Sequence, residues 1–113
     1  MAATNEQVTG HAFLKALYRD GYYPDHLVDR GKEILLRLCE RVEAERPDGL
    51  DALYALTRDA TEEFNALQDA FWEADSDLET VAREEIAGDF GFVALAYGFQ
   101  DADVEELIAA RDW

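Results

Sequence analysis

A regular spacing of apolar residues runs through the middle of the chain and strongly favours a helical fold. The positions follow one another at alternating steps of three and four: Leu50, Leu53, Thr57, Ala60, Phe64, Leu67 and Phe71. Because an α-helix turns once every 3.6 residues, they form one stripe on a helix packed against a parallel or antiparallel partner. Asp48 is a suitable N-cap, and the helix should run to about Ala74. We expect Leu53, Phe64 and Leu67 to be nearly fully buried.

Four further helices are expected from similar apolar spacing, bounded by capping residues, glycine or proline. They cover about residues 5–20 with Thr4 as the cap, 25–46, the segment between the cap Ser76 and Gly98, and 102–110 with Asp101 as the cap. Period-two alternation never persists, so no strand is expected. The sequence therefore predicts an all-α fold. Residues 1–113 would form a single-domain antiparallel bundle of about five helices, three of them long.

The charge of the chain is strongly acidic and uneven. It has 26 acidic and 10 basic residues, a formal net charge of −16. Residues 1–46 are nearly neutral, whereas residues 47–113 carry 18 acids and only Arg58, Arg83 and Arg111. Such a surface repels phosphate, so we expect no binding to nucleic acid or to anionic membranes.

The expected compartment follows from features that the sequence lacks. The longest apolar run, from Phe92 to Tyr97, is too short to span a membrane. The first residues do not follow the pattern of a secretory signal, and the lone Cys39 has no partner for an internal disulfide. We therefore expect a cytoplasmic protein. Nothing in the sequence indicates its oligomeric state.

Recognisable stretches are distributed over nearly the whole chain. They are Tyr22-Tyr23-Pro24-Asp25, Leu27-Val28-Asp29, Gly31-Lys32, Ile34-Leu35-Leu36-Arg37-Leu38-Cys39-Glu40, Ala52-Leu53-Tyr54-Ala55-Leu56-Thr57, Ala60-Thr61-Glu62-Glu63-Phe64-Asn65, Ala96-Tyr97-Gly98-Phe99, Glu105-Glu106-Leu107-Ile108-Ala109 and Arg111-Asp112-Trp113. In these stretches the chain resembles an uncharacterised bacterial family, domain-of-unknown-function family 5713. The resemblance implies no activity, cofactor or catalytic residue.

Two groups of carboxylates are candidates for holding magnesium. Glu62 and Glu63 lie within one predicted helix, and Glu84, Glu85 and Asp89 lie within the next. All-helical nucleotide pyrophosphatases hold metal beside a triphosphate with acids on two helices. In those enzymes the members of the second acidic pair are separated by two residues, and this spacing is missing here. The sequence also has no cluster of basic residues that could bind the phosphates. The alternative interpretation is a solvated helix face.

Other catalytic or metal chemistry has little support in the sequence. The histidines, His11 and His26, have no spacing to Cys39 that is typical of a zinc site. Cys39 lies beside the apolar stripe of its helix, where burial would leave the thiol inert. We therefore expect no catalytic residue and no cofactor, and an enzyme is the less favoured class.

Two segments are candidate binding sites. Tyr22 and Tyr23 lie in a loop at one end of the bundle, although such tyrosines often pack over the core. Asp69, Glu73 and Asp75 lie at the end of the central helix, where the helix dipole disfavours acids. The favoured hypothesis is a non-enzymatic module, similar to an immunity protein or antitoxin, that binds a basic protein. The alternatives are a magnesium-dependent nucleotide hydrolase, and acidity that serves only solubility or salt adaptation.

Overall fold

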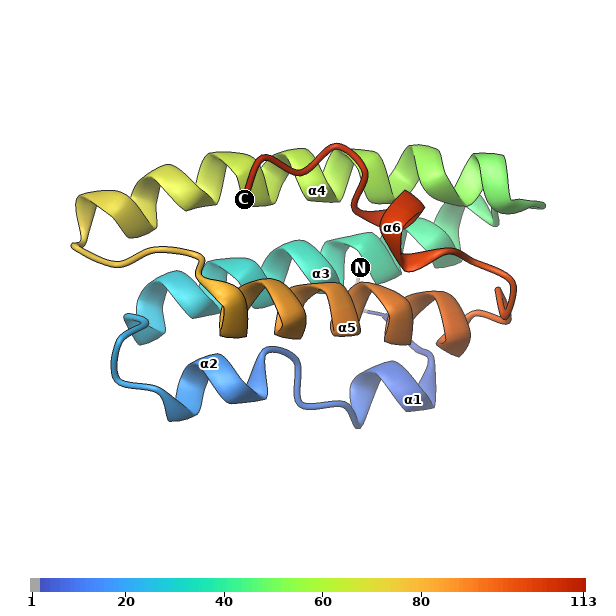
Figure 1. Ribbon diagram of the computed structural model, residues 1–113. Helices are drawn as coiled ribbons and strands as arrows, with labels where there is room; N and C mark the ends of the chain where they lie inside the picture. The colour runs from blue at the N-terminus through green and yellow to red at the C-terminus, as the bar shows by residue number, and fades with distance from the viewer. Residues whose placement is uncertain (1–2) are drawn as a thin grey trace.

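The computed structural model describes residues 3–113 as an assembly of helices (Figure 1). Three helices are long, and the others are single short turns. The helices are α1 (Glu6–Thr9), α2 (Lys15–Arg19), α3 (Asp25–Glu45), α4 (Leu50–Glu73), α5 (Thr80–Ala96) and α6 (Val104–Leu107). Residues 3–113 contain no strand. The predicted all-α class with three long helices is confirmed.

The long helices pack side by side in alternating directions. The ion pairs Arg37–Glu63 and Arg41–Asp59 join positions that advance along α3 and retreat along α4, so these two helices are antiparallel. α5 runs back across them, and α1 and α2 form a fourth, interrupted rod on its other side (Figure 1). Short connections between long helices lead to this up-and-down arrangement.

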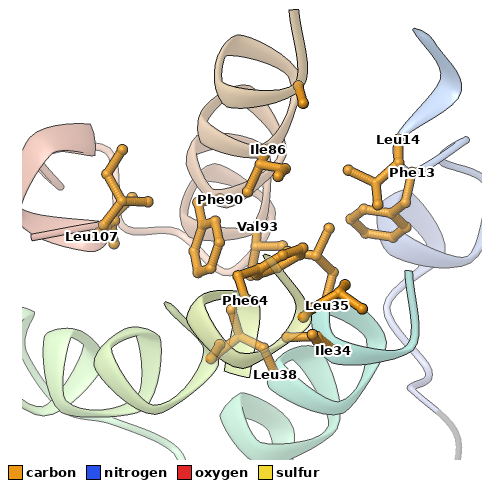
Figure 2. Packing of buried hydrophobic residues seen from close by; sticks show 14 of the residues in the cluster. Phe13, Leu14, Ile34, Leu35, Leu38, Phe64, Ile86, Phe90, Val93 and Leu107 are labelled. Atoms are coloured by element: carbon orange, nitrogen blue, oxygen red, sulfur yellow. The ribbon is translucent and has the colours of Figure 1, made fainter. Parts of the chain in front are cut away.

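One hydrophobic cluster joins all four rods. Figure 2 shows Phe64 of α4 between side chains of α3 and α5, with Phe13 and Leu14 of the α1–α2 segment nearby. Phe64 is 1% exposed, and its ring lies edge-on to Phe90 with centroids 5.9 Å apart. Leu53 and Leu67 are also buried, so the predicted stripe on α4 is confirmed.

The predicted helix over residues 5–20 is wrong, because the chain leaves the helical path at residues 10–14. Leu14 has a φ of 56°, in the left-handed region that few leucines adopt. In a continuous helix its N–H would donate to the carbonyl of Gly10. Here it donates to Oδ2 of Asp89 at 2.7 Å, while Nε2 of His11 lies 2.8 Å from Oδ1 of the same carboxylate. The buried carboxylate of Asp89 on α5 thus accepts the amide hydrogen that a continuous helix would bond internally.

The predicted N-caps are also replaced by other residues. The amide and hydroxyl of Thr4 donate to Glu43 on α3, and the hydroxyl of Ser76 donates to the carbonyl of Tyr22. These side chains therefore connect separate elements and do not cap their own helix. The residues at the N-cap positions of α1, α4, α5 and α6 are Asn5, Gly49, Glu79 and Asp103.

The last residues of the chain lie along α4. The amides of Asn65 and Gln68 donate to the Ala110 carbonyl and the Asp112 carboxylate at 2.9 and 3.1 Å. Trp113 is 7% exposed and packs edge-on to Phe64 with centroids 6.1 Å apart. The last helix, α6, is shorter than the predicted range of 102–110 and lies inside it. None of the helices described in residues 3–113 combines the length and apolar character that crossing a bilayer requires.

Candidate functional site

The structure brings the two candidate binding segments together at one end of the bundle. The loop before α3 and the loop between α4 and α5 meet where Ser76 Oγ donates to the Tyr22 carbonyl at 3.0 Å. A cleft of about 460 Å³ opens beside this contact. Its lining comes from both loops and the start of α5: Asp20, Tyr22, Tyr23, Asp77, Glu79, Thr80, Val81 and Arg83. We call this end, together with Asp69, Trp72, Glu73 and Asp75, the acidic tip.

The end of α4 gives the acidic tip a defined backbone. The amide of Ser76 donates to the Phe71 carbonyl at 2.8 Å, and the amide of Asp75 donates to the Trp72 carbonyl at 3.1 Å. These two bonds form a Schellman motif, which places the residue after the helix in the left-handed region. Asp75 occupies that position with a φ of 60°. Glycine is the usual residue there, so the chain keeps an acid where glycine would be easier to accommodate.

The aromatic residues of the acidic tip divide into one anchor and two exposed rings. Tyr23 is only 3% exposed and packs edge-on to Phe71 in the core. Tyr22 stacks edge-on to Tyr23 and remains 42% exposed, and Trp72 is 52% exposed. The indole N–H of Trp72 donates to Asp77 at 2.8 Å, which fixes the ring on the surface. Direct contact with a partner is therefore open to Tyr22 and Trp72, while Tyr23 supports them from below.

The acids at the end of α4 have no ion-pair partner in the described chain, and Arg83 is the one basic residue that lines the cleft. Asp69, Glu73 and Asp75 are exposed, and none has an ion pair within residues 3–113. The basic residues that form ion pairs lie elsewhere. Arg37 and Arg41, for example, pair with acids along the joint face of α3 and α4. Loss of hydration, followed by the charges of Glu79 and Asp77, raises the pKa of Tyr22.

The five magnesium candidates are not arranged as a metal site. Asp89 is 6% exposed. Its Oδ2 accepts the amide of Leu14, and its Oδ1 lies against Nε2 of His11. Glu85 accepts the amide of Ala16 at 2.6 Å, and Glu63 is paired with Arg37. Glu62 and Glu84 are exposed. In the described chain, no group of three or more His, Cys, Asp or Glu residues is placed to hold a metal ion. The geometry gives the nucleotide hydrolase hypothesis no support.

A second polar cluster ties the N-terminal segment to α3 and the end of α5, and no sequence pattern indicated it. Glu43 accepts hydrogen bonds from the amides of Thr4 and Asn5 and from the hydroxyl of Tyr97. Led by the Tyr97 bond, these contacts lower the pKa of Glu43 to about 2. Burial raises the pKa of the neighbouring Cys39 thiol to about 12, which favours the protonated form at neutral pH.

A comparison with known protein families gives one match. Residues 7–113 match the model of a family described as "Family of unknown function (DUF5713)". The chain belongs to this family. No curated protein and no solved structure matches the chain.

The match to DUF5713 begins within α1 and includes the tip, the break before α2 and the docked C-terminal residues. The family description assigns no activity or ligand. The function of this DUF5713 chain must therefore be inferred from its own surface.

Proposed function

We propose that this DUF5713 protein is a non-enzymatic binding module that captures a basic protein with its acidic tip. One observation carries the proposal: the fold gathers unpaired acids and two exposed aromatic rings at one end, around an open cleft. Aromatic rings held by their neighbours supply contact area at low entropic cost, and uncompensated acids attract a partner of opposite charge. Immunity proteins and antitoxins are binding proteins of this general kind.

The position of the acids supports a use beyond solubility. Glu73 and Asp75 lie at the C-terminal end of α4, where the helix dipole already carries negative charge. Asp75 also adopts a backbone conformation that favours glycine. A chain that needed only solubility could place these charges on any exposed turn. The same potential that attracts a basic protein repels nucleic acid and anionic lipid. The proposal places this protein in the cytoplasm, where a lone thiol stays reduced.

Capture from an extract of the source cell tests the proposal. The tip variant carries Asp69→Asn, Glu73→Gln and Asp75→Asn, and asparagine tolerates the backbone of residue 75. We expect the wild-type protein to retain a basic protein at low salt and to release it as salt is raised. At low salt the tip variant should retain much less of it than the wild type does.

A control variant separates the effect of the tip acids from the effect of total charge. Asp51→Asn, Glu62→Gln and Glu106→Gln remove the same number of exposed acids outside the tip. It should capture the partner as the wild type does. Equal capture by the tip variant and the wild type would show that the acidic tip is only a solvated surface.

A further inference from the structure

The second half of α5 borders an apolar groove that the acidic tip does not explain. The groove has a volume of about 470 Å³, and Gln100 is the one polar side chain among its lining residues. Two large apolar side chains stand at its rim, since Leu95 is 60% exposed and Val104 is 37% exposed. Apolar side chains that gather on one patch of surface mark interaction sites.

Gly88 lies on the lining of this groove, and the fold does not require a glycine there. It is exposed within α5, and a Cβ atom added to it would meet nothing within 4 Å. Glycine inside a helix is less stable than alanine, so the position carries a cost without a packing benefit. Gly91 differs, because its Cβ would lie 3.3 Å from Val104 Cγ2. Because Gly88 has no side chain, nothing at this position covers the groove on its solvent side.

The charges around the groove determine which occupant suits it. No lysine, arginine or histidine occurs from residue 84 to residue 110. Exposed Asp101 and Asp103 flank the lining residue Ala102, and exposed Glu84 lies one helical turn before Gly88. A second copy of this chain, with its own net charge of −16, would be repelled from such a surface. A basic segment with an apolar face is complementary to it.

We propose that the α5 groove is a docking site for a basic amphipathic helix of a partner protein. Apolar side chains of that helix would enter the groove over Gly88 and Leu95, and its lysines or arginines would face Glu84, Asp101 and Asp103. The groove begins at Ala87, about 12 Å from Glu79 along α5 at about 1.5 Å per residue, and reaches Leu95, about 24 Å from Glu79. The proposal does not depend on binding at the tip.

A synthetic probe tests the docking site without knowledge of the partner. The probe is a leucine–lysine peptide of about 18 residues, long enough to form a helix, with its leucines on one face. A scrambled peptide of the same composition measures attraction by charge alone. We expect the ordered peptide to shift the amide resonances of Gly88, Gly91 and Leu95, and the scrambled peptide to shift them much less. Equal shifts from both peptides, or shifts concentrated at the acidic tip, would overturn the proposal.

Filling the groove gives a second readout. Gly88→Leu should weaken binding of the ordered peptide by about tenfold or more, because it places a side chain where the partner would enter. It should leave the free energy of unfolding unchanged or higher, so loss of binding cannot be attributed to unfolding. Ala66→Leu adds the same side chain to an exposed position on α4 and should bind as the wild type does.

Two further comparisons distinguish the groove from the other surfaces. The tip variant should bind the peptide as the control variant of equal charge does. A loss confined to the tip variant would overturn the groove proposal and leave the proposed function intact.

Sedimentation in high salt tests whether a second copy of the chain occupies the groove. A monomer agrees with the proposal, and a dimer that Gly88→Leu dissociates would contradict it.

Discussion

Single side chains decide where this fold departs from simple helical periodicity. Asp89 is the leading example, because its carboxylate accepts the amide of Leu14 and meets His11. The ring of His11 in turn stacks on Phe92 with centroids 3.9 Å apart. The break between α1 and α2 thus depends on an acid 75 residues further along the chain.

Removal of the Asp89 carboxylate should destabilise the protein. In Asp89→Ala the buried amide of Leu14 loses its acceptor, and an unsatisfied buried donor costs about 1–3 kcal/mol. Urea denaturation should show this loss, and hydrogen exchange at the Leu14 amide should become faster. Glu84→Ala, on the exposed side of the same helix, is the control and should change stability by less than about 0.5 kcal/mol. A similar free energy of unfolding for both variants would refute the role of Asp89.

Asp75 should show the opposite behaviour. Its φ of 60° favours glycine, so Asp75→Gly should raise the free energy of unfolding by roughly 0.5–1 kcal/mol. Removal of an acid from the C-terminal end of α4 acts in the same direction. Asp69→Gly places the same residue within the helix and should lower stability by about 1 kcal/mol. If Asp75→Gly is also destabilising, the carboxylate has a structural role that the contacts do not reveal.

At the scale of elements, the α4 stripe predicted its helix well because burial of one face determines both the spacing and the packing. Helices α3 and α5 were predicted for the same reason. The first helix and the caps were not, because their groups bond to distant segments. The Leu14 and Thr4 amides donate to Asp89 and Glu43, and the Ser76 hydroxyl donates to the Tyr22 carbonyl. Hydrogen bonds between segments that are distant in the sequence do not produce a periodic pattern of residues.

The candidate site was predictable to the same degree. The acids and tyrosines of the tip were found from loop composition and helix ends. The contact between the two loops through Ser76 and Tyr22 could be seen only in the structure. The same holds for the position of Trp72 on the surface. The α5 groove was not predicted, because the sequence pattern does not distinguish exposed apolar residues such as Leu95 and Val104 from buried ones, and only the structure shows them exposed.

The Glu43 cluster should make stability depend on pH. Its pKa is lowered from the ordinary 4.5 to about 2, so the ionised carboxylate stabilises the fold above about pH 4.5. That contribution should be lost as the pH falls from 4.5 towards 2. Solvent around the partly exposed carboxylate makes the loss smaller than the full shift implies. Glu43→Gln should therefore be less stable than the wild type at neutral pH, and the difference should shrink in acid. A constant difference across that range would contradict this assignment.

For the whole molecule, the net charge of −16 predicts a response to salt. Raising sodium chloride from about 0.01 M to 0.1 M shortens the Debye length from about 30 Å to 10 Å and screens repulsion between exposed acids. The melting temperature should rise over this range. The tip variant has less charge to screen and should show a smaller rise. A melting temperature that does not change with salt would mean that the acids scarcely repel one another in the folded state.

Photo-crosslinking in the source cell, from inside and outside the acidic tip, tests directly whether the tip binds a basic protein. Ala74 is exposed beside Glu73 and Asp75, and Ala52 is exposed at the far end of α4. A photoreactive amino acid at either position leaves every acid in place. We expect a crosslink from position 74 to a strongly basic protein, with little or none of that protein crosslinked from position 52. The same proteins crosslinked equally from both positions, or no basic protein crosslinked from position 74, would contradict it.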